Sequence, residues 1–400
     1  MYFYLELSLS FLLHWIFQIL KRFRNWLNCI QKKSFCTLNL KFVSSGFDNP
    51  IFPTEVANAI ARLPKGKAAG PSGISVDLLK GACKAASEIS IDLADYFQQL
   101  VCLKVIPPIE LTAARLIALV KPGNGIKPDG IRPIVVGESI SRLFASIVFN
   151  RVVDNAGRFL SPFQFGIKTI DGASVAALTS DLFFNSHDDN FIFNLDFKNA
   201  FNSVSRKSVF AAIEKDFPGL TSYFYLFYGK PSDLIYDSYS LKSMSGVKQG
   251  DPLGPLFFCL AIHDSLLCIL KKYPDLKIVN YMDDISTIFP LDLLKKVAVE
   301  VADIYETLGL SLNPDKCLLI GRSTQELFIN GVQIPFINYV EDAFSFLRCW
   351  LGKVPKIFQE LFNCLEKIGS ELNTISSYDI EKHVKFFILK IATPEKSHIF

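Results

Sequence analysis

The chain has 400 residues, of which 50% are hydrophobic and 13% aromatic, including 36 phenylalanines. This composition excludes a generally disordered protein and suffices for two or three domains with buried cores. The formal net charge of +3 does not by itself indicate a nucleic-acid partner, and the nine cysteines form no CxxC or CxxxC pair. The cysteines therefore predict free thiols in a reducing compartment and no zinc site.

The N-terminal segment 2–20 is apolar and almost long enough to cross a bilayer. It contains Glu6 and His14, and the first basic residue, Lys21, follows it. A signal peptide carries its positive charge before the apolar stretch, so a secretory signal is disfavoured. We expect residues 1–45 to be a packed or interfacial segment outside the main domain, with membrane anchoring through residues 2–20 as the minority alternative.

Apolar residues recur at helical spacing in several parts of the chain. They predict helices over residues 51–63, 87–104, 171–186, 203–215, a segment that begins after Pro252, and 294–308. Short apolar runs predict strands on both sides of the Gly/Pro-rich loop in 116–136, in "NFIFNLDF" (190–197), twice in "KIVNYMDDISTIF" (277–289) and in "KCLLI" (316–320). From residue 190 onward the order is β–α–α–β–β–α–β, which predicts an α+β fold with an antiparallel sheet.

Two adjacent carboxylates, Asp283 and Asp284, interrupt the apolar run 277–289 at its predicted turn. A solvated turn would explain them, because Asp is common in turns. A third carboxylate, Asp196, also ends an apolar strand. If these strands are neighbours, three carboxylates meet at one edge of the sheet. Such ligands suit Mg²⁺, and two ions about 4 Å apart could serve phosphoryl transfer. The residues alone leave both interpretations open.

Four motifs follow one another along the chain: "FNLDFKNAFNSVSR", "SGVKQGDPLGPLFFCLAIHD", "YMDD" and "GLSLNPDKC". Together they resemble the reverse transcriptase domain of non-LTR retrotransposons. The upstream "LPKGKAAGPSGI", "VKPGNG…IRPIV" and "QFG" resemble the finger motifs of that family, and "FLRCWLG" resembles its primer grip. The resemblance covers residues 50–352 and implies a right-handed fingers–palm–thumb polymerase, in which helices flank the antiparallel palm sheet.

The resemblance also implies site residues. It makes Asp196, Asp283 and Asp284 the catalytic carboxylates, with Asp196, Asp283 and the backbone carbonyl of Phe197 as ligands of two Mg²⁺ ions, for which Mn²⁺ can substitute. It assigns nucleotide binding to Lys121, Arg132, Phe201, Gln249 and Gly250, a leaving-group acid to Lys316, and the primer grip to Phe346, Leu347 and Gly352. Without the resemblance, Phe201 would be a core residue, the segment around Gln249 a structural loop, and the basic residues solvated charges.

The implied organisation is fingers over residues 46–180, palm over 181–335, and a primer-grip region with a truncated thumb over 336–400. Implied partners are an RNA template with a DNA primer and dNTPs, in the nucleus or cytoplasm. The implied function is RNA-directed DNA polymerisation, in which a primer 3′-hydroxyl is extended by two-metal phosphoryl transfer.

Some features depart from the family pattern. Ala69 and Ser72 stand where many relatives have Pro and Asp, and no second acidic cluster suggests an endonuclease or RNase H. The net charge is also small for an enzyme that binds a duplex by itself. A catalytically decayed nucleic-acid-binding relic is therefore the main alternative function, and a membrane-anchored protein is the second.

Overall fold

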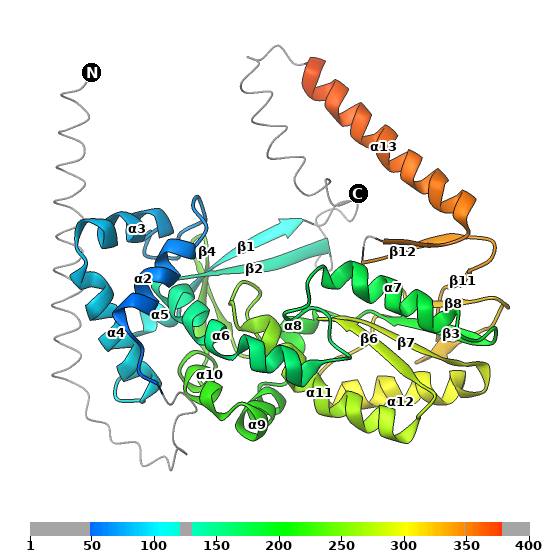
Figure 1. The fold of residues 1–400 in the computed structure, drawn as a ribbon, viewed down its shortest axis with the longest axis horizontal. Coiled ribbons are helices and arrows are strands. Elements are labelled where there is room, and N and C mark those ends of the chain that lie inside the picture. The colour runs from blue at the N-terminus through cyan, green and yellow to red at the C-terminus, as the bar shows by residue number, and fades with distance from the viewer. Residues whose placement is uncertain (1–48, 121–129, 348, 378–400) are drawn as a thin grey trace. The chain divides into compact units, whose positions relative to one another are not determined.

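The computed structural model describes residues 49–120, 130–347 and 349–377 (Figure 1). The apolar segment 2–20 and Lys121 lie outside the described residues. The chain forms two compact units. Unit 1 takes in the described chain up to Phe159, then Asn199–Asp264 and Leu308–Leu310; unit 2 takes in Leu160–Lys198, Ser265–Thr307 and the chain from Ser311 onward. Because the units are discontinuous, the assignment of consecutive ranges to fingers, palm and thumb stays a prediction.

Unit 1 contains a four-stranded sheet and several helices. The sheet has the order β2 (Ile131–Gly137), β1 (Ala114–Val120), β4 (Ser232–Tyr236) and β5 (Tyr239–Ser243). The helices are α2 (Pro53–Arg62), α3 (Val76–Ala85), α4 (Glu88–Val101), α5 (Ile109–Thr112), α6 (Ser139–Leu160), α8 (Ala200–Ser203), α9 (Arg206–Asp216), α10 (Thr221–Tyr228) and the first half of α11 (Gly254–Lys272), with the 3₁₀ turn η2 (Pro218–Leu220). Strands β1 and β2 are antiparallel, as the Gly/Pro-rich loop between them predicts, whereas β1 and β4 are parallel.

Aromatic side chains fill the core of unit 1. Phe97 of α4 stacks on Phe144 of α6 with 4.9 Å between ring centroids, and Tyr223 stacks on Phe227 within α10 at 4.6 Å. Offset and tilted aromatic pairs of this kind stabilise a core beyond the area they bury. The abundance of Phe in the sequence is thus used to pack the helices of this unit together.

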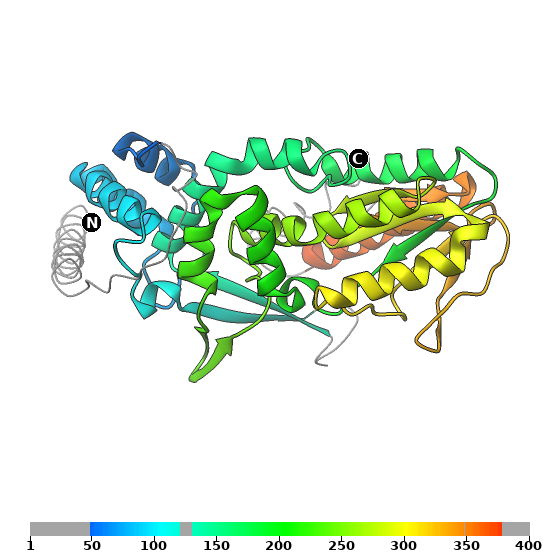
Figure 2. The ribbon, with the colours of Figure 1, turned by 90° about the horizontal axis from the view of Figure 1, so that it is seen from below.

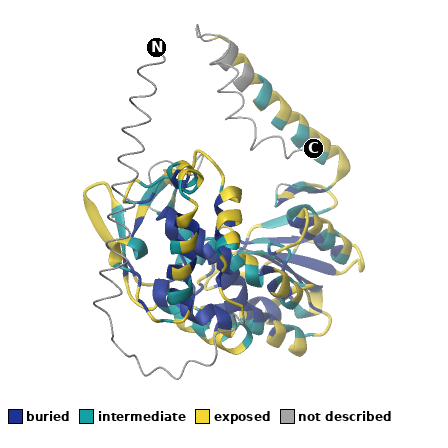
Figure 3. Ribbon diagram, turned by 60° about the vertical axis from the view of Figure 1, so that its left-hand side comes forward, coloured by how far each residue is buried: buried dark blue, intermediate teal, exposed yellow. Residues whose placement is uncertain are grey.

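Unit 2 is built on a five-stranded sheet of order β11 (Phe336–Asn338), β8 (Leu318–Gly321), β3 (Asn190–Leu195), β7 (Asp284–Pro290) and β6 (Lys277–Tyr281). Figures 1 and 2 show α7 (Gly172–Phe184) on one face and α12 (Leu294–Thr307) on the other. The unit also contains η3 (Leu291–Leu293), the hairpins β9–β10 (Phe328–Ile329, Val332–Gln333) and β12–β13 (Ala343–Phe346, Cys349–Gly352), and α13 (Val354–Ser377). Strands β8, β3, β7 and β6 are mostly buried and β11 is half-buried, whereas α13 is largely exposed (Figure 3).

Most sequence predictions of the fold are confirmed. The chain is α+β, and the predicted helices and strands occur near their predicted positions. The predicted antiparallel sheet is only partly correct, because β11 pairs with β8 in parallel and makes the sheet of unit 2 mixed. The cysteines within the described residues are free thiols, as expected. Within the same residues, α11 is long and apolar enough to cross a membrane, but 61% of its most apolar stretch is buried in the protein.

Candidate active site

The predicted carboxylates of unit 2 meet at one edge of its sheet. The register pairs Leu195 of β3 with Ile285 of β7, so Asp196, the residue after Leu195, comes level with Asp284. Asp283 lies in the turn that joins β6 to β7. Asp196 and Asp283 are half-buried, whereas Asp284 is exposed. The roles predicted for these three carboxylates stay predictions.

Backbone geometry and one side chain fix the turn that carries Asp283. Met282, its first residue, has a φ of 58°, which a two-residue hairpin turn requires at this position. The amide of Met282 donates to Oε1 of Gln164 at 2.7 Å, and the amide of Gly166 donates to the same oxygen at 2.9 Å. A Cβ atom at Gly166 would lie 2.6 Å from Cγ of Met282, so only glycine allows this approach. The "QFG" motif therefore supports the acidic turn directly.

The "NPDKC" motif holds the backbone of Asp196. The Asn313 amide donates to the carbonyl of Asp196 at 2.8 Å, and the amide of Asp196 donates to Sγ of Cys317 at 3.4 Å. Phe197 forms an antiparallel bridge with Leu312. The hydrogen bonds that flank this bridge use the Asp196 carbonyl and the Lys198 amide. The carbonyl of Phe197, a predicted metal ligand, is therefore not part of the ladder.

The oxygen atoms at this edge of the sheet suit Mg²⁺ only if substrate phosphates supply further ligands. Among the described residues, no group of three or more His, Cys, Asp or Glu side chains is arranged to hold a metal ion. Protein-bound Mg²⁺ commonly uses one or two carboxylates together with substrate phosphates. Asp196, Asp283 and the Phe197 carbonyl provide hard oxygen atoms of that kind. The residues therefore fit a site that substrate phosphates complete, and they do not form an all-protein metal cage.

In unit 1, the predicted nucleotide-binding loop rests on β2. The amide of Val135 donates to the carbonyl of Gln249 at 2.7 Å. Gly250 has a φ of 124°, and a Cβ atom there would lie 2.0 Å from the Val135 carbonyl oxygen. Arg132 is on the same strand and exposed. Unit 1 thus brings Gln249 and Gly250 onto the strand that carries Arg132.

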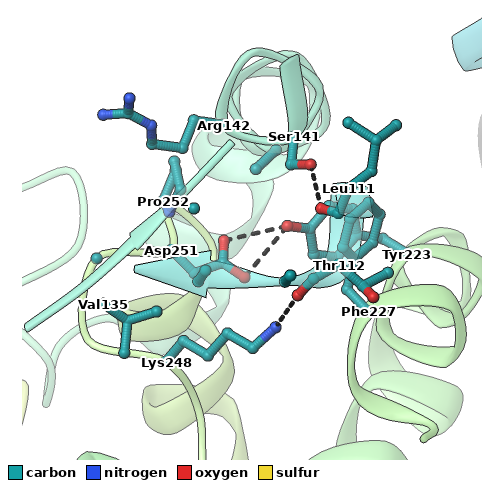
Figure 4. A pocket seen from close by; sticks show the side chains of 15 residues that line it. Leu111, Thr112, Val135, Ser141, Arg142, Tyr223, Phe227, Lys248, Asp251 and Pro252 are labelled. Atoms are coloured by element: carbon teal, nitrogen blue, oxygen red, sulfur yellow. Dashed lines mark hydrogen bonds between the residues drawn. The ribbon is translucent and has the colours of Figure 1, made fainter. Parts of the chain in front are cut away.

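Lys248, the residue before Gln249, turns into the protein (Figure 4). Its Nζ donates to the carbonyl of Thr112 at 3.1 Å and lies 5.5 Å from the ring centroid of Tyr228. Burial lowers the pKa of Lys248 to about 8, although Asp251 partly opposes the shift. The cavity beside these side chains measures about 30 Å³, which is far too small for a nucleotide. Lys248 is therefore part of the base of the loop.

Asp251 continues this buried network. Its carboxylate accepts hydrogen bonds from the hydroxyls of Tyr223 and Tyr228, the latter at 2.6 Å, and from the Leu253 amide just before α11. The residue keeps some exposed surface, but burial of its carboxylate dominates and raises the pKa of Asp251. Burial likewise raises the pKa of both tyrosines. The segment 248–251 is thus anchored on both sides of Gln249.

Phe201 and Arg206 hold the other end of the same loop. The Phe201 carbonyl accepts from the Val247 amide at 2.7 Å, and its half-buried ring lies 5.0 Å from that of Phe258. Arg206 donates from Nε to the carbonyl of Gly246 at 2.9 Å, and from Nη2 to Oγ of Ser243 at 2.8 Å. Two predicted nucleotide contacts, Phe201 and the Gln249 loop, are therefore joined through the backbone of unit 1.

Ser72 anchors a further loop of unit 1 to Glu138. The amide and hydroxyl of Ser72 both donate to the carboxylate of Glu138, at 2.7 and 2.6 Å. An aspartate at position 72 would place a second negative charge against Glu138. Serine instead satisfies this buried carboxylate, so the loop has a defined anchor.

The family model "Reverse transcriptase (RNA-dependent DNA polymerase)" matches residues 120–347, which is more than half of the chain. The chain belongs to the reverse transcriptase family. The match runs from Val120 to Leu347, so it includes the motifs from "VKPGNG…IRPIV" to "GLSLNPDKC" and the start of "FLRCWLG". The resemblance inferred from these motifs is confirmed.

Curated relatives are retrotransposon proteins. The chain is 30% identical over 264 residues to a Pol polyprotein from the type-1 retrotransposable element R2 of Popillia japonica, which covers 60% of this chain and 36% of that protein. It is 28% identical over 273 residues to the SLACS 132 kDa protein of Trypanosoma brucei gambiense, covering 66% and 22%. It is 25% identical over 375 residues to the R2DM polyprotein of Drosophila melanogaster, covering 86% and 34%. The chain thus spans between 22% and 36% of the length of these relatives.

The remaining predicted residues have simple positions in this reverse transcriptase fold. Phe346 is buried in the core of unit 2 together with Phe344 and Leu351, and Leu347 packs against that core. Gly352 ends β13. Lys316 is exposed in the turn after Asn313. Phe346 thus packs in the core, and the primer-grip roles of Phe346, Leu347 and Gly352 and the role of Lys316 stay predictions.

Sequence reasoning missed several residues that support this site. Gln164 contacts a turn that is 118 positions away, and Cys317 contacts a strand end that is 121 positions away. Arg206 and Asp251 lie inside quoted motifs, but the motifs alone assign no role to either residue. Only their positions within motifs could have indicated a role from the sequence. Their hydrogen-bond partners become apparent only in the fold.

Proposed function

We propose that this chain is an RNA-directed DNA polymerase of a non-LTR retrotransposon, which extends a primer 3′-hydroxyl with dNTPs on an RNA template. The observation that carries the proposal is the register of the unit 2 sheet, which brings Asp196 level with the turn containing Asp283 and Asp284. Family membership over residues 120–347 supports the same activity.

In this proposal Asp196, Asp283 and the Phe197 carbonyl hold two Mg²⁺ ions, for which Mn²⁺ can substitute. When bound, such ions lower the pKa of the attacking hydroxyl and stabilise the charge on the departing pyrophosphate. Asp284 is exposed. It contributes negative charge near the metal ions but makes no indispensable bond to them. Lys316, also exposed, is assigned as the acid that protonates the leaving group.

The residues of unit 1 are assigned to the incoming nucleotide. Arg132 offers a planar fork of donors that suits phosphate oxygens. Gln249 offers both a donor and an acceptor, and its backbone is fixed by Val135. The half-buried ring of Phe201 is assigned to exclusion of a ribose 2′-hydroxyl. A side chain that is held from behind, as Phe201 is by Phe258, can act as a rigid steric barrier.

The alternative function is a nucleic-acid-binding relic without catalysis. The chain has both Asp196 and Asp283, and a separate hydrogen bond holds the backbone at or beside each of them. Both features favour the enzyme. The test is primer extension by the purified chain on a poly(rA)–oligo(dT) duplex with dTTP and Mg²⁺ or Mn²⁺. Metal-dependent extension supports the proposal. Template binding without extension under both metals would instead support the relic.

A further inference from the structure

A pair of buried amide side chains lies behind the acidic turn of unit 2. Gln164 and Asn280 form a parallel β-bridge, in which Phe165 donates its amide to the carbonyl of Asn280 and Asn280 donates its amide to the carbonyl of Phe163. Gln164 is 5% exposed and Asn280 is completely buried. Residues paired in a bridge project to the same side of the ladder, so the two amide groups are neighbours.

These amides are unusual because part of their hydrogen-bonding capacity is unused. Among the described residues, Nε2 of Gln164 and both Nδ2 and Oδ1 of Asn280 have no hydrogen-bond partner. Buried polar groups are normally paired, and leaving them unpaired costs free energy. Aliphatic side chains would fill this space at lower cost. The presence of two amides therefore calls for a reason other than packing.

The one side-chain atom of this pair that does form hydrogen bonds within the described residues indicates why the amides are present. Oε1 of Gln164 accepts from the amides of Met282 and Gly166, and no other atom of the two side chains is bonded within the described residues. Met282 has the positive φ that non-glycine residues adopt at a cost, so its conformation needs support from its surroundings. Asn280 lies on β6, two residues before Met282 in the turn that follows this strand.

We propose that Gln164 and Asn280 form a polar node that positions the Met282–Asp283 turn, and that Gln164 is thereby a positioning residue for nucleotide addition. In this node Gln164 supplies the acceptor for the turn. The Oδ1 acceptor and Nδ2 donor of Asn280 give the Gln164 amide a polar neighbour, which favours the rotamer that directs Oε1 to the turn. The kinetic part of this inference rests on the proposed function; the structural part does not.

The first test measures the turn itself. Hydrogen–deuterium exchange in a peptide containing Met282 should be at least about tenfold faster in Gln164→Met than in the wild-type chain, because the amide loses its acceptor. The shorter amide Gln164→Asn should behave the same way, and it carries the test if the Met variant does not fold. Unchanged exchange in a folded variant would overturn the proposal.

The second test separates positioning from general stability. Asn190→Leu is the matched control. Asn190 is a buried amide that donates to the Phe183 carbonyl, and it begins β3, at the end of the strand away from Asp196. In single-turnover dTTP addition, Gln164→Asn should lower the maximal rate about tenfold, with less than about a twofold change in the apparent dTTP constant. Asn190→Leu should lower the melting temperature without this rate loss. An equal rate loss in both variants would mean a merely structural role.

The third test addresses Asn280. Asn280→Val should lower the same rate constant. The double variant Gln164→Asn/Asn280→Val should add at most about a twofold loss to that of the slower single variant, because both residues act through one node. Independent, multiplied losses would overturn the role of Asn280. A wild-type chain that does not extend a primer would refute the proposed function alone, and amide exchange would still decide whether Gln164 fixes the turn.

Discussion

The amide of Asp196 donates to Sγ of Cys317 at 3.4 Å, across 121 positions of sequence. Burial raises the pKa of Cys317 to about 11, so this sulfur is a neutral thiol at physiological pH. A buried thiol of this kind is unreactive. Its evident role is its contact with the backbone of Asp196, the first carboxylate residue of the proposed site.

Replacement of Cys317 by alanine should leave the Asp196 amide without its acceptor. We expect a loss of about 1–3 kcal/mol in the free energy of unfolding, and a fall of about tenfold in the rate of nucleotide addition. Urea titration and single-turnover extension measure the two effects. Cys268→Ala is the control, since Cys268 is exposed. A Cys317→Ala enzyme as stable and fast as this control would refute the positioning role of the thiol.

Gly250→Ala should disrupt the loop that contains Gln249. The added Cβ would lie 2.0 Å from the Val135 carbonyl oxygen, at a φ of 124° that alanine avoids. We expect loss of several kcal/mol of stability or a displaced loop with a raised dNTP KM. Gly81→Ala in α3 is the matched control, because nothing lies within 4 Å of its Cβ position. The control should be neutral or stabilising by up to about 1 kcal/mol; similar behaviour of both variants would contradict the contact.

Lys248 should make stability rise with pH in the alkaline range. Its pKa falls from 10.5 to about 8 on burial, so the unfolded chain binds more protons between these values. The free energy of unfolding of the wild type, relative to Lys248→Met, should therefore increase from pH 8 upward, by at most about 3 kcal/mol. Tyr223 and Tyr228, whose pKa values are raised, oppose this trend above about pH 10 in both proteins.

Urea unfolding of the wild type and Lys248→Met at pH 7.5 and pH 9.5 checks this expectation. The subtraction removes the contribution of the tyrosines, which both proteins share. A difference in unfolding free energy that stays constant, or falls with pH, would mean that Lys248 is not buried beneath the loop.

The sequence predicted the features that depend on local pattern. Apolar runs bounded by turn residues located β3, β6 and β7, and these strands place Asp196 and Asp283 at their ends. Local pattern could not reveal that Gln164 meets Met282, because nothing near either residue records the other. Local pattern also says nothing of the burial of Lys248, because that burial depends on tertiary packing against Thr112 and Tyr228. The β4–β5 hairpin of "DLIYDSYSLK" was missed because its residues are largely polar or exposed.

Phe201→Val should relax sugar discrimination. If the ring excludes a 2′-hydroxyl, its removal should raise rNTP relative to dNTP incorporation by about 10-fold or more, while DNA synthesis stays measurable. Kinetics with dTTP and UTP give the ratio. Phe210→Val is the control, because Phe210 is also half-buried and packs against an aromatic ring, that of Phe224. An unchanged ratio with a lowered melting temperature would show that Phe201, which contacts Phe258, serves only packing.

Asp283, in the turn between β6 and β7, is proposed to bind metal, whereas Asp284, the first residue of β7, is proposed to be less important. The most direct measurement is single-nucleotide addition by wild type, Asp283→Asn and Asp284→Asn on poly(rA)–oligo(dT) at saturating Mg²⁺, with template binding measured in parallel. Asp283→Asn should slow addition about 10³-fold with template affinity retained, because a group that stabilises the transition state through the metal is lost. Asp284→Asn should cause a milder loss, since Asp284 is exposed. Addition by Asp283→Asn at near the wild-type rate would show that Asp283 is not a metal ligand.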